Sequence, residues 1–176
     1  MAGGHAFVDE SKATQYVLAV TSVDSSRVNA VRKTMKALLL PRQSRIHFRD
    51  ERDGRKVRIV DQLLSIGLAA RVYVTDRKPD ELRAGASCLH RMMEDLAAAA
   101  GVRELVIERD DSLLVHDRRV VAAASAKHFP DRSLHYQWLT AYDDPMLWAR
   151  DAIAWCWSAS GAWQRRVSNI VTAVEL

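Results

Sequence analysis

Three acidic side chains occupy positions where apolar residues are expected. On a helical wheel of residues 144–155, Asp151 falls between Leu147 and Trp155, inside the apolar stripe. Asp9 ends a short apolar run, and Glu108 directly follows three apolar residues. A buried carboxylate without a partner is strongly unfavourable. Asp151 is therefore predicted to have a partner, which is a cation, a network of hydrogen-bond donors or a metal ion.

Together these acids suggest a metal centre. Two are expected at strand ends, where Asp9 shares a face with Phe7 and Glu108 shares a face with Val106. Mg²⁺ takes oxygen ligands and keeps several waters, so two or three carboxylates and a substrate phosphate suffice. Two such ions about 4 Å apart activate water in phosphodiester cleavage. The sequence thus offers Asp9, Glu108 and Asp151 as a candidate catalytic set for Mg²⁺ or Mn²⁺.

Most acids in these segments also have a purely structural explanation. Asp151 would form a buried ion pair with one of the many arginines, and Asp9 would begin a hairpin turn. Glu108 has no comparable explanation. The acids that are adequately explained as helix caps are Asp110, Asp111 and Asp144.

Other catalytic chemistries find less support. Cys88 and His90 are two residues apart with no second pair at ligand spacing, so no zinc site is predicted. Ser160 precedes Gly161 but lacks the flanking glycines of a nucleophile elbow. The 7 glycines are scattered and form neither a dinucleotide-binding nor a Walker pattern.

Residues 42–58 form a polar and basic segment. Its excess of basic over acidic residues is four, which equals the formal net charge of +4 for the whole chain. As a flexible segment it is suited to following a phosphate backbone. The alternative is solvated salt bridges with its own three acids. The residues predicted to contact nucleic acid are Arg45, Arg49, Arg52 and Arg55.

The composition narrows the classes of protein. A length of 176 residues predicts one domain, residues 1–176, with a sizeable core. The chain is 48% hydrophobic and 27% charged, which is typical of a globular protein. Two cysteines are too few for a disulfide framework. No stretch reaches the roughly 20 apolar residues of a membrane span, and no secretory signal is recognised. We therefore expect a cytoplasmic protein that does not enter a membrane.

Strands and helices alternate along the chain to position the candidate residues. Strands are expected at residues 5–11, 15–23, 69–75, 104–107 and 134–140. Helices are expected near residues 25–40, 56–65, 80–100, 111–128 and 145–158, while the tail 163–176 suits either. The first two strands are too close for a crossover, which indicates an opening β-hairpin. The prediction is an α/β fold with a mixed five-stranded sheet and helices on both faces.

Four segments carry a resemblance to a known family. They are Phe-Val-Asp-Glu-Ser at 7–11, Arg-Ile-His-Phe at 45–48, Leu-Val-Ile-Glu-Arg at 105–109 and Leu-Trp-Ala-Arg-Asp-Ala-Ile-Ala at 147–154. In this order they resemble the domain-of-unknown-function-3800 family, over about residues 6–163. That family is similar to the ribonuclease H-like superfamily, which has a mixed five-stranded sheet and a carboxylate-rich, metal-dependent nuclease centre.

The resemblance implies a role for each acid. Asp9 would be the central first-strand acid that bridges the metals, Glu108 the acid at the fourth strand's end, and Asp151 the acid of the last helix. His47 would be a proton shuttle or a phosphate contact. The chain departs from the family pattern at Lys12, which replaces a glycine, and at Arg150, where an apolar residue is usual. A cation beside Asp151 is expected to weaken metal binding.

Two main functions of different classes follow, and an enzyme that acts on a small phosphate-containing substrate is a third. The first is a metal-dependent nuclease that acts on RNA, DNA or a hybrid. The second is a non-catalytic module with the same fold that binds nucleic acid or protein, in which Arg150 or Lys12 pairs with the acids and no metal enters. A tryptophan-rich late helix is typical of a core or of a dimer interface, so a homodimer is one expected assembly.

Overall fold

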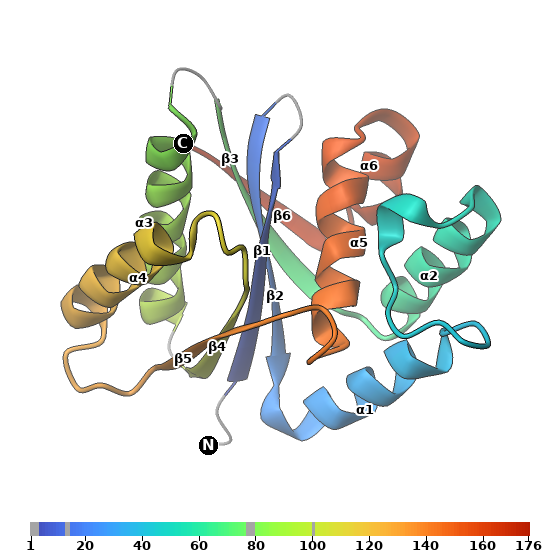
Figure 1. The fold of residues 1–176 in the computed structure, drawn as a ribbon, viewed down its shortest axis with the longest axis horizontal. Helices are drawn as coiled ribbons and strands as arrows, with labels where there is room; N and C mark the ends of the chain where they lie inside the picture. Colours follow the sequence, from blue (N-terminus) through green and yellow to red (C-terminus); the bar gives the residue numbers. More distant parts are fainter. Residues whose placement is uncertain (1–3, 13–14, 77–79, 100) are drawn as a thin grey trace.

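A mixed sheet of six strands runs through the centre of the molecule (Figure 1). The computed structural model describes residues 4–12, 15–76, 80–99 and 101–176. The order across the sheet is β5-β4-β1-β2-β3-β6. The strands are β1 (Gly4–Lys12), β2 (Gln15–Asp24), β3 (Ala69–Asp76), β4 (Val102–Glu108), β5 (His135–Leu139) and β6 (Val171–Glu175).

The opening hairpin and the mixed sheet are confirmed. β1 pairs antiparallel with β2, and β2 pairs antiparallel with β3. The pairs β1–β4, β4–β5 and β3–β6 are parallel. The predicted hairpin turn includes Ala13 and Thr14, which lie outside the described residues. In this order the carboxyl end of β1 comes to lie beside that of β4.

The predicted number of strands, five, is too low by one. The sixth strand, β6, comes from the tail that the sequence left open between helix and strand. The tail contains both, because α6 (Gly161–Val167) precedes β6. β6 is a short edge strand without a fully buried residue, so it carries little of the alternation that identifies a strand.

Helices cover both faces of the sheet, as predicted (Figure 1). One face carries α3 (Glu81–Ala99) and α4 (Leu114–His128), which pack on a core that includes Val8 and Ile107. The other face carries α1 (Ser25–Ala37), α2 (Asp53–Ser65), α5 (Met146–Ser158) and α6, over a core that includes Phe7 and Val106. Neighbouring residues of one strand thus enter different cores.

The basic segment is more ordered than the sequence suggested. A short 3₁₀ turn, η1 (Phe48–Asp50), interrupts it, and α2 begins at Asp53. The helix predicted near residues 56–65 therefore begins three residues earlier, and Asp53 and Gly54 belong to the first turn of α2. Phe48 is fully buried and packs edge-on against Trp155, which fixes the segment to α5.

Of the acids predicted as helix caps, Asp144 is confirmed, whereas Asp110 and Asp111 do not cap α4; Asp24 caps a further helix. Asp24 accepts a hydrogen bond from the backbone N–H of Ser26 at 2.8 Å and begins α1. Asp144 accepts from the N–H of Met146 at 2.9 Å, at the start of α5, and also pairs with Arg32. Asp110 instead closes the turn that precedes α4, which begins at residue 114.

In the described part of the chain no helix is long and apolar enough to cross a membrane.

Gly85 lies where α3 approaches the sheet most closely. A Cβ atom added there would stand 2.8 Å from Oη of Tyr16, a buried side chain of β2, whereas a Cβ at Gly54 in α2 would meet open space. Both changes to alanine gain helix propensity. We expect Gly85→Ala to be less stable than Gly54→Ala by about 1–3 kcal/mol in urea unfolding, because of overpacking. Equal stabilities would contradict this close approach.

Candidate functional site

Asp9 and Glu108 lie side by side where the pairing of β1 with β4 ends. Glu108 is the last residue of β4, whereas Asp9 lies within β1 and pairs with Ala19, so it does not begin the hairpin turn. The parallel register pairs Val8 with Ile107, so the two acids follow at the next position on each strand. Side chains alternate between the faces of a sheet, and Phe7 and Val106 belong to the core beneath α5. Asp9 and Glu108 therefore face α5, as the sequence predicts.

The helix α5 supplies the other charged groups of the site. It packs on β1 and β2, and nine of its 13 residues are buried while none is exposed. A helix that is buried on all sides is usually apolar throughout, yet α5 contains two charged residues in succession. Arg150 is fully buried at 0% exposure, and Asp151 is half-buried.

The Arg150 guanidinium bridges the two strand acids. Its Nη1 contacts Oδ2 of Asp9, and its Nη2 donates to Oε2 of Glu108. Neither Nε nor Nη1 has a hydrogen bond of regular geometry among the described residues, so the contact of Nη1 with Asp9 is an ion pair. Arginine commonly forms a fork with both oxygens of one carboxylate, but here each Nη atom serves a different strand. Arg150 therefore lies between Asp9 and Glu108.

Asp151 has a backbone partner. Its Oδ2 accepts a hydrogen bond from the N–H of Phe48, in η1, at 2.9 Å. The prediction that this carboxylate needs a partner is confirmed, and the partner is a backbone hydrogen-bond donor. The buried arginine, Arg150, pairs with Asp9 and Glu108 instead. The hydrogen bond from Phe48 also ties the basic segment to the acidic centre.

Burial dominates the electrostatics of the centre. It raises the pKa of Asp9 and the pKa of Glu108 above their ordinary values, and the charge of Asp151 raises both further. Arg150 opposes the rise without cancelling it. Three carboxylates and one guanidinium leave a net charge of −2 when all are ionised. The centre is therefore short of positive charge.

The three acids line one cleft of about 280 Å³ together with basic side chains from the segment before α2. The charged and histidine side chains on its wall are Asp9, Glu10, Glu108, Asp151, Arg45, Arg49 and His47. The convergence of all three predicted acids with His47 and two of the predicted arginines is the main geometric finding. An anionic group entering the cleft would meet both arginines and acids on its wall.

His47 is held at the start of η1. Its Nδ1 lies 2.7 Å from Oδ2 of Asp50, and both side chains are exposed. This hydrogen bond and the charge of His47 lower the pKa of Asp50. Asp50 thus orients the imidazole through Nδ1, and Nε2 is the nitrogen that remains for other contacts.

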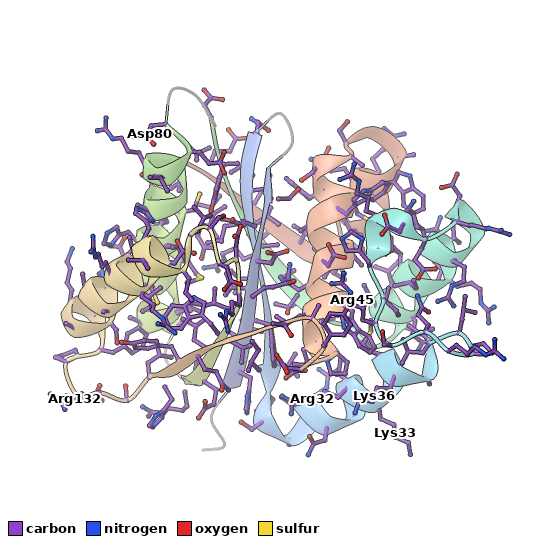
Figure 2. The ribbon with its side chains drawn as sticks, in the orientation of Figure 1. Arg32, Lys33, Lys36, Arg45, Asp80 and Arg132 are labelled. Atoms are coloured by element: carbon purple, nitrogen blue, oxygen red, sulfur yellow. The ribbon has the colours of Figure 1, made fainter. Side chains whose placement is uncertain are left out.

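Arg45 has an aromatic partner that the sequence did not predict. Its guanidinium carbon lies 4.8 Å from the ring centroid of Tyr142, which is 65% exposed. Figure 2 shows Arg45 on the side of the sheet that carries α5. Arg45 comes from the segment before α2 and Tyr142 from the loop before α5, so only the folded chain brings them together.

Arg52 and Arg55 lie outside the cleft, along an adjoining hollow that Arg45 also lines. Arg55 donates to Glu51 at 3.0 Å and to the carbonyl oxygen of Leu38 at 2.9 Å. The alternative of local salt bridges is therefore confirmed for Arg55. Its side chain fixes the segment to the end of α1 and is the least available of the four for a phosphate.

A second cavity of about 480 Å³ lies against the ends of β1 and β4. Glu10 accepts a hydrogen bond from Oη of Tyr16 there, on the wall that also carries Asp117. The cavity wall is strongly acidic. It carries six acids and one basic side chain, Arg109, and it shares Asp9, Glu10 and Glu108 with the cleft.

The residues fit one divalent cation better than two. Among the described residues no three His, Cys, Asp or Glu side chains are grouped so that they could hold a metal ion. Mg²⁺ needs only one or two carboxylates when a substrate phosphate and waters complete its shell. One divalent charge also balances the net −2 of the centre. The sequence predicts a pair of ions, but Arg150 already occupies the position between Asp9 and Glu108.

The chain is similar in fold to solved structures of ribonucleases HII and HIII. The chain is similar to the structure of the PCNA:RNase HII complex from Archaeoglobus fulgidus, with a TM-score of 0.56 and 12% identity over 94% of this chain and 75% of that one. It is also similar to Bst-RNase HIII in complex with Mn²⁺, with a TM-score of 0.54 and 15% identity over 87% of this chain and 51% of that one. No protein-family profile and no curated protein matches the chain.

These similarities show the fold. The mixed sheet with helices on both faces is ribonuclease H-like, as the sequence resemblance implied. Identities of 12% and 15% do not extend the likeness to an activity. Membership of the domain-of-unknown-function-3800 family stays a prediction.

Proposed function

We propose that this protein is a metal-dependent nuclease that hydrolyses phosphodiester bonds of RNA, DNA or a hybrid. The observation that carries the proposal is the convergence of Asp9, Glu108 and Asp151 on one cleft with Arg45 and Arg49. The acids come from two strands and a helix, so the fold rather than the local sequence brings them together. Mg²⁺ or Mn²⁺ is the expected cofactor, and Mn²⁺ is present in the similar Bst-RNase HIII structure.

The acids supply the ligands for the cation. Asp151 has one oxygen bonded to the N–H of Phe48, and Asp9 and Glu108 each have one oxygen on Arg150. Their remaining oxygens and a substrate phosphate would hold one Mg²⁺ or Mn²⁺. When bound, the cation activates a water for attack and stabilises charge on the phosphoryl oxygens.

The basic side chains position the substrate. Arg45 and Arg49 are placed to bind phosphates in the cleft, and the exposed imidazole of His47 is placed to exchange a proton with the reacting groups. Asp50 holds the imidazole through Nδ1. Cleavage is expected to leave 3′-hydroxyl ends. Incubation with labelled RNA, DNA and hybrid strands, with and without Mn²⁺, tests the proposal. Absence of cleavage of every strand in Mn²⁺ would contradict it.

Removal of a cleft arginine is expected to weaken strand binding. Arg45→Ala and Arg49→Ala should each lower affinity for a DNA strand and reduce the salt dependence of binding by about one phosphate contact. The control is Arg132→Ala, because Arg132 lies on the far side of the sheet, beyond α4 (Figure 2). Fluorescence anisotropy across a series of salt concentrations gives the slope. Identical slopes for all three variants would argue against binding of the strand by the cleft arginines.

A second candidate function is favoured by Arg150. A fully buried guanidinium between Asp9 and Glu108 is the arrangement expected for a non-catalytic module that binds nucleic acid or protein without a metal. Strand binding that is unchanged by Mn²⁺, with no cleavage, would select this function. A homodimer and a cytoplasmic location remain predictions.

A further inference from the structure

The position of Arg150 has no explanation in the packing of α5. The nearby residues Ala149 and Ala152 are fully buried and small, and α5 packs in the apolar core of this face. An arginine enters such a position only if its charge is compensated. Compensation comes from Asp9 and Glu108, which belong to two different strands.

The guanidinium binds these acids as a metal ion would. It takes one oxygen from each of two carboxylates, and it is wholly shielded from solvent. Its charge lies between Asp9 of β1 and Glu108 of β4. Both acids also belong to the proposed metal centre. Unlike a metal ion, it is covalently fixed and cannot leave when the substrate leaves.

We infer that Arg150 permanently takes the place of one divalent cation between Asp9 and Glu108. The inference deepens the proposed function, on which it rests for the kind of cation involved. The protein then needs at most one exchangeable cation, held with the help of Asp151, where two would otherwise bind. Arg150 is in this sense a positioning residue, because it acts on the substrate only through the two acids.

The test is the number of Mn²⁺ ions bound per chain, counted by electron paramagnetic resonance of the free ion. Arg150→Met removes the charge with little change in side-chain length, and we expect it to bind one more Mn²⁺ than the unchanged protein. Arg150→Lys keeps the charge and is expected to bind no additional ion. Adding Glu108→Gln to Arg150→Met should abolish the gain, because it removes a ligand of the new site.

A matched control separates this effect from a general increase in negative charge. Arg109 directly follows Glu108, is half exposed and pairs with Asp111 at 2.6 Å. Arg109→Met changes the net charge by the same amount at the next residue of the chain. We expect no additional Mn²⁺ in this variant. A gain in Arg109→Met equal to that in Arg150→Met would overturn the inference, and so would no gain in Arg150→Met.

The result is informative even if Arg150→Met does not fold by itself. In that case Mn²⁺ should restore the folded circular dichroism spectrum of Arg150→Met, or of the milder Arg150→Gln. Failure of Mn²⁺ to restore either variant, while Arg150→Lys folds, would also overturn the inference. The proposed function is tested separately by the unchanged protein, which must bind Mn²⁺ and cleave a strand whatever the variants do.

Discussion

Replacing Arg150 with methionine is expected to lower the free energy of unfolding by about 3–5 kcal/mol at neutral pH in the absence of metal. Removing one partner of a buried ion pair leaves uncompensated charge in a medium of low polarity, and losses of this size are typical. Here two carboxylates, Asp9 and Glu108, lose their counter-charge at once. Urea unfolding of the variant and of the unchanged protein measures the difference.

The loss in Arg150→Met should shrink as the pH falls. Burial already raises the pKa of Asp9 and of Glu108, and loss of the guanidinium raises both further in the folded variant. An acid whose folded pKa exceeds its unfolded value binds more protons when folded, so its penalty is greatest above the folded pKa and is relieved as the pH falls through it. Unfolding at pH 7.5 and 5.0 should show this narrowing. Arg109→Met, at an exposed ion pair, should change stability by less than about 0.5 kcal/mol at either pH.

The second large effect concerns activity. Asp9→Asn should lower the cleavage rate by at least about 100-fold, because it removes the charge of a proposed metal ligand. Asp9 lies beside Glu108 in the register of β1 and β4, and it lines the cleft. Asparagine has nearly the same shape, and Arg150 keeps its contact with Glu108, so the variant should remain folded. Single-turnover cleavage in Mn²⁺ and a circular dichroism spectrum check the two expectations.

Asp144→Asn is the matched control for Asp9→Asn. Asp144 is also a buried acid, but it caps α5 and pairs with Arg32, away from the cleft. Asp144→Asn should lower the free energy of unfolding and leave the cleavage rate within a few-fold of that of the unchanged protein. A cleavage rate in Asp9→Asn equal to that of the unchanged protein would remove Asp9 from the catalytic set.

Much of the site could be predicted because strand alternation is local. The pattern that placed Asp9 with Phe7, and Glu108 with Val106, is confirmed by the cores in which Phe7 and Val106 are found. The helical wheel placed Asp151 among apolar residues, and the structure gives it the backbone partner that such a position requires. These predictions depend only on the period of each element.

What could not be predicted depends on the relative placement of elements. The same wheel contains Arg150, and the alternative in which Arg150 pairs with the acids is confirmed. Its partners lie more than 40 residues away along the chain, however, so the sequence alone did not single out Asp9 and Glu108. The contact between Arg45 and Tyr142 has the same origin. β6 escaped prediction for another reason, because an edge strand without a fully buried residue lacks strong alternation.

The central claim is that the acids beside Arg150 hold a divalent cation on a bound strand. A crystal of the protein with an uncleaved DNA strand, soaked in Mn²⁺, tests it by anomalous scattering. We predict one Mn²⁺ peak in contact with Asp151 and with Asp9 or Glu108, while Arg150 keeps its place between the strand acids. A bound strand without a Mn²⁺ peak at these acids would contradict the claim.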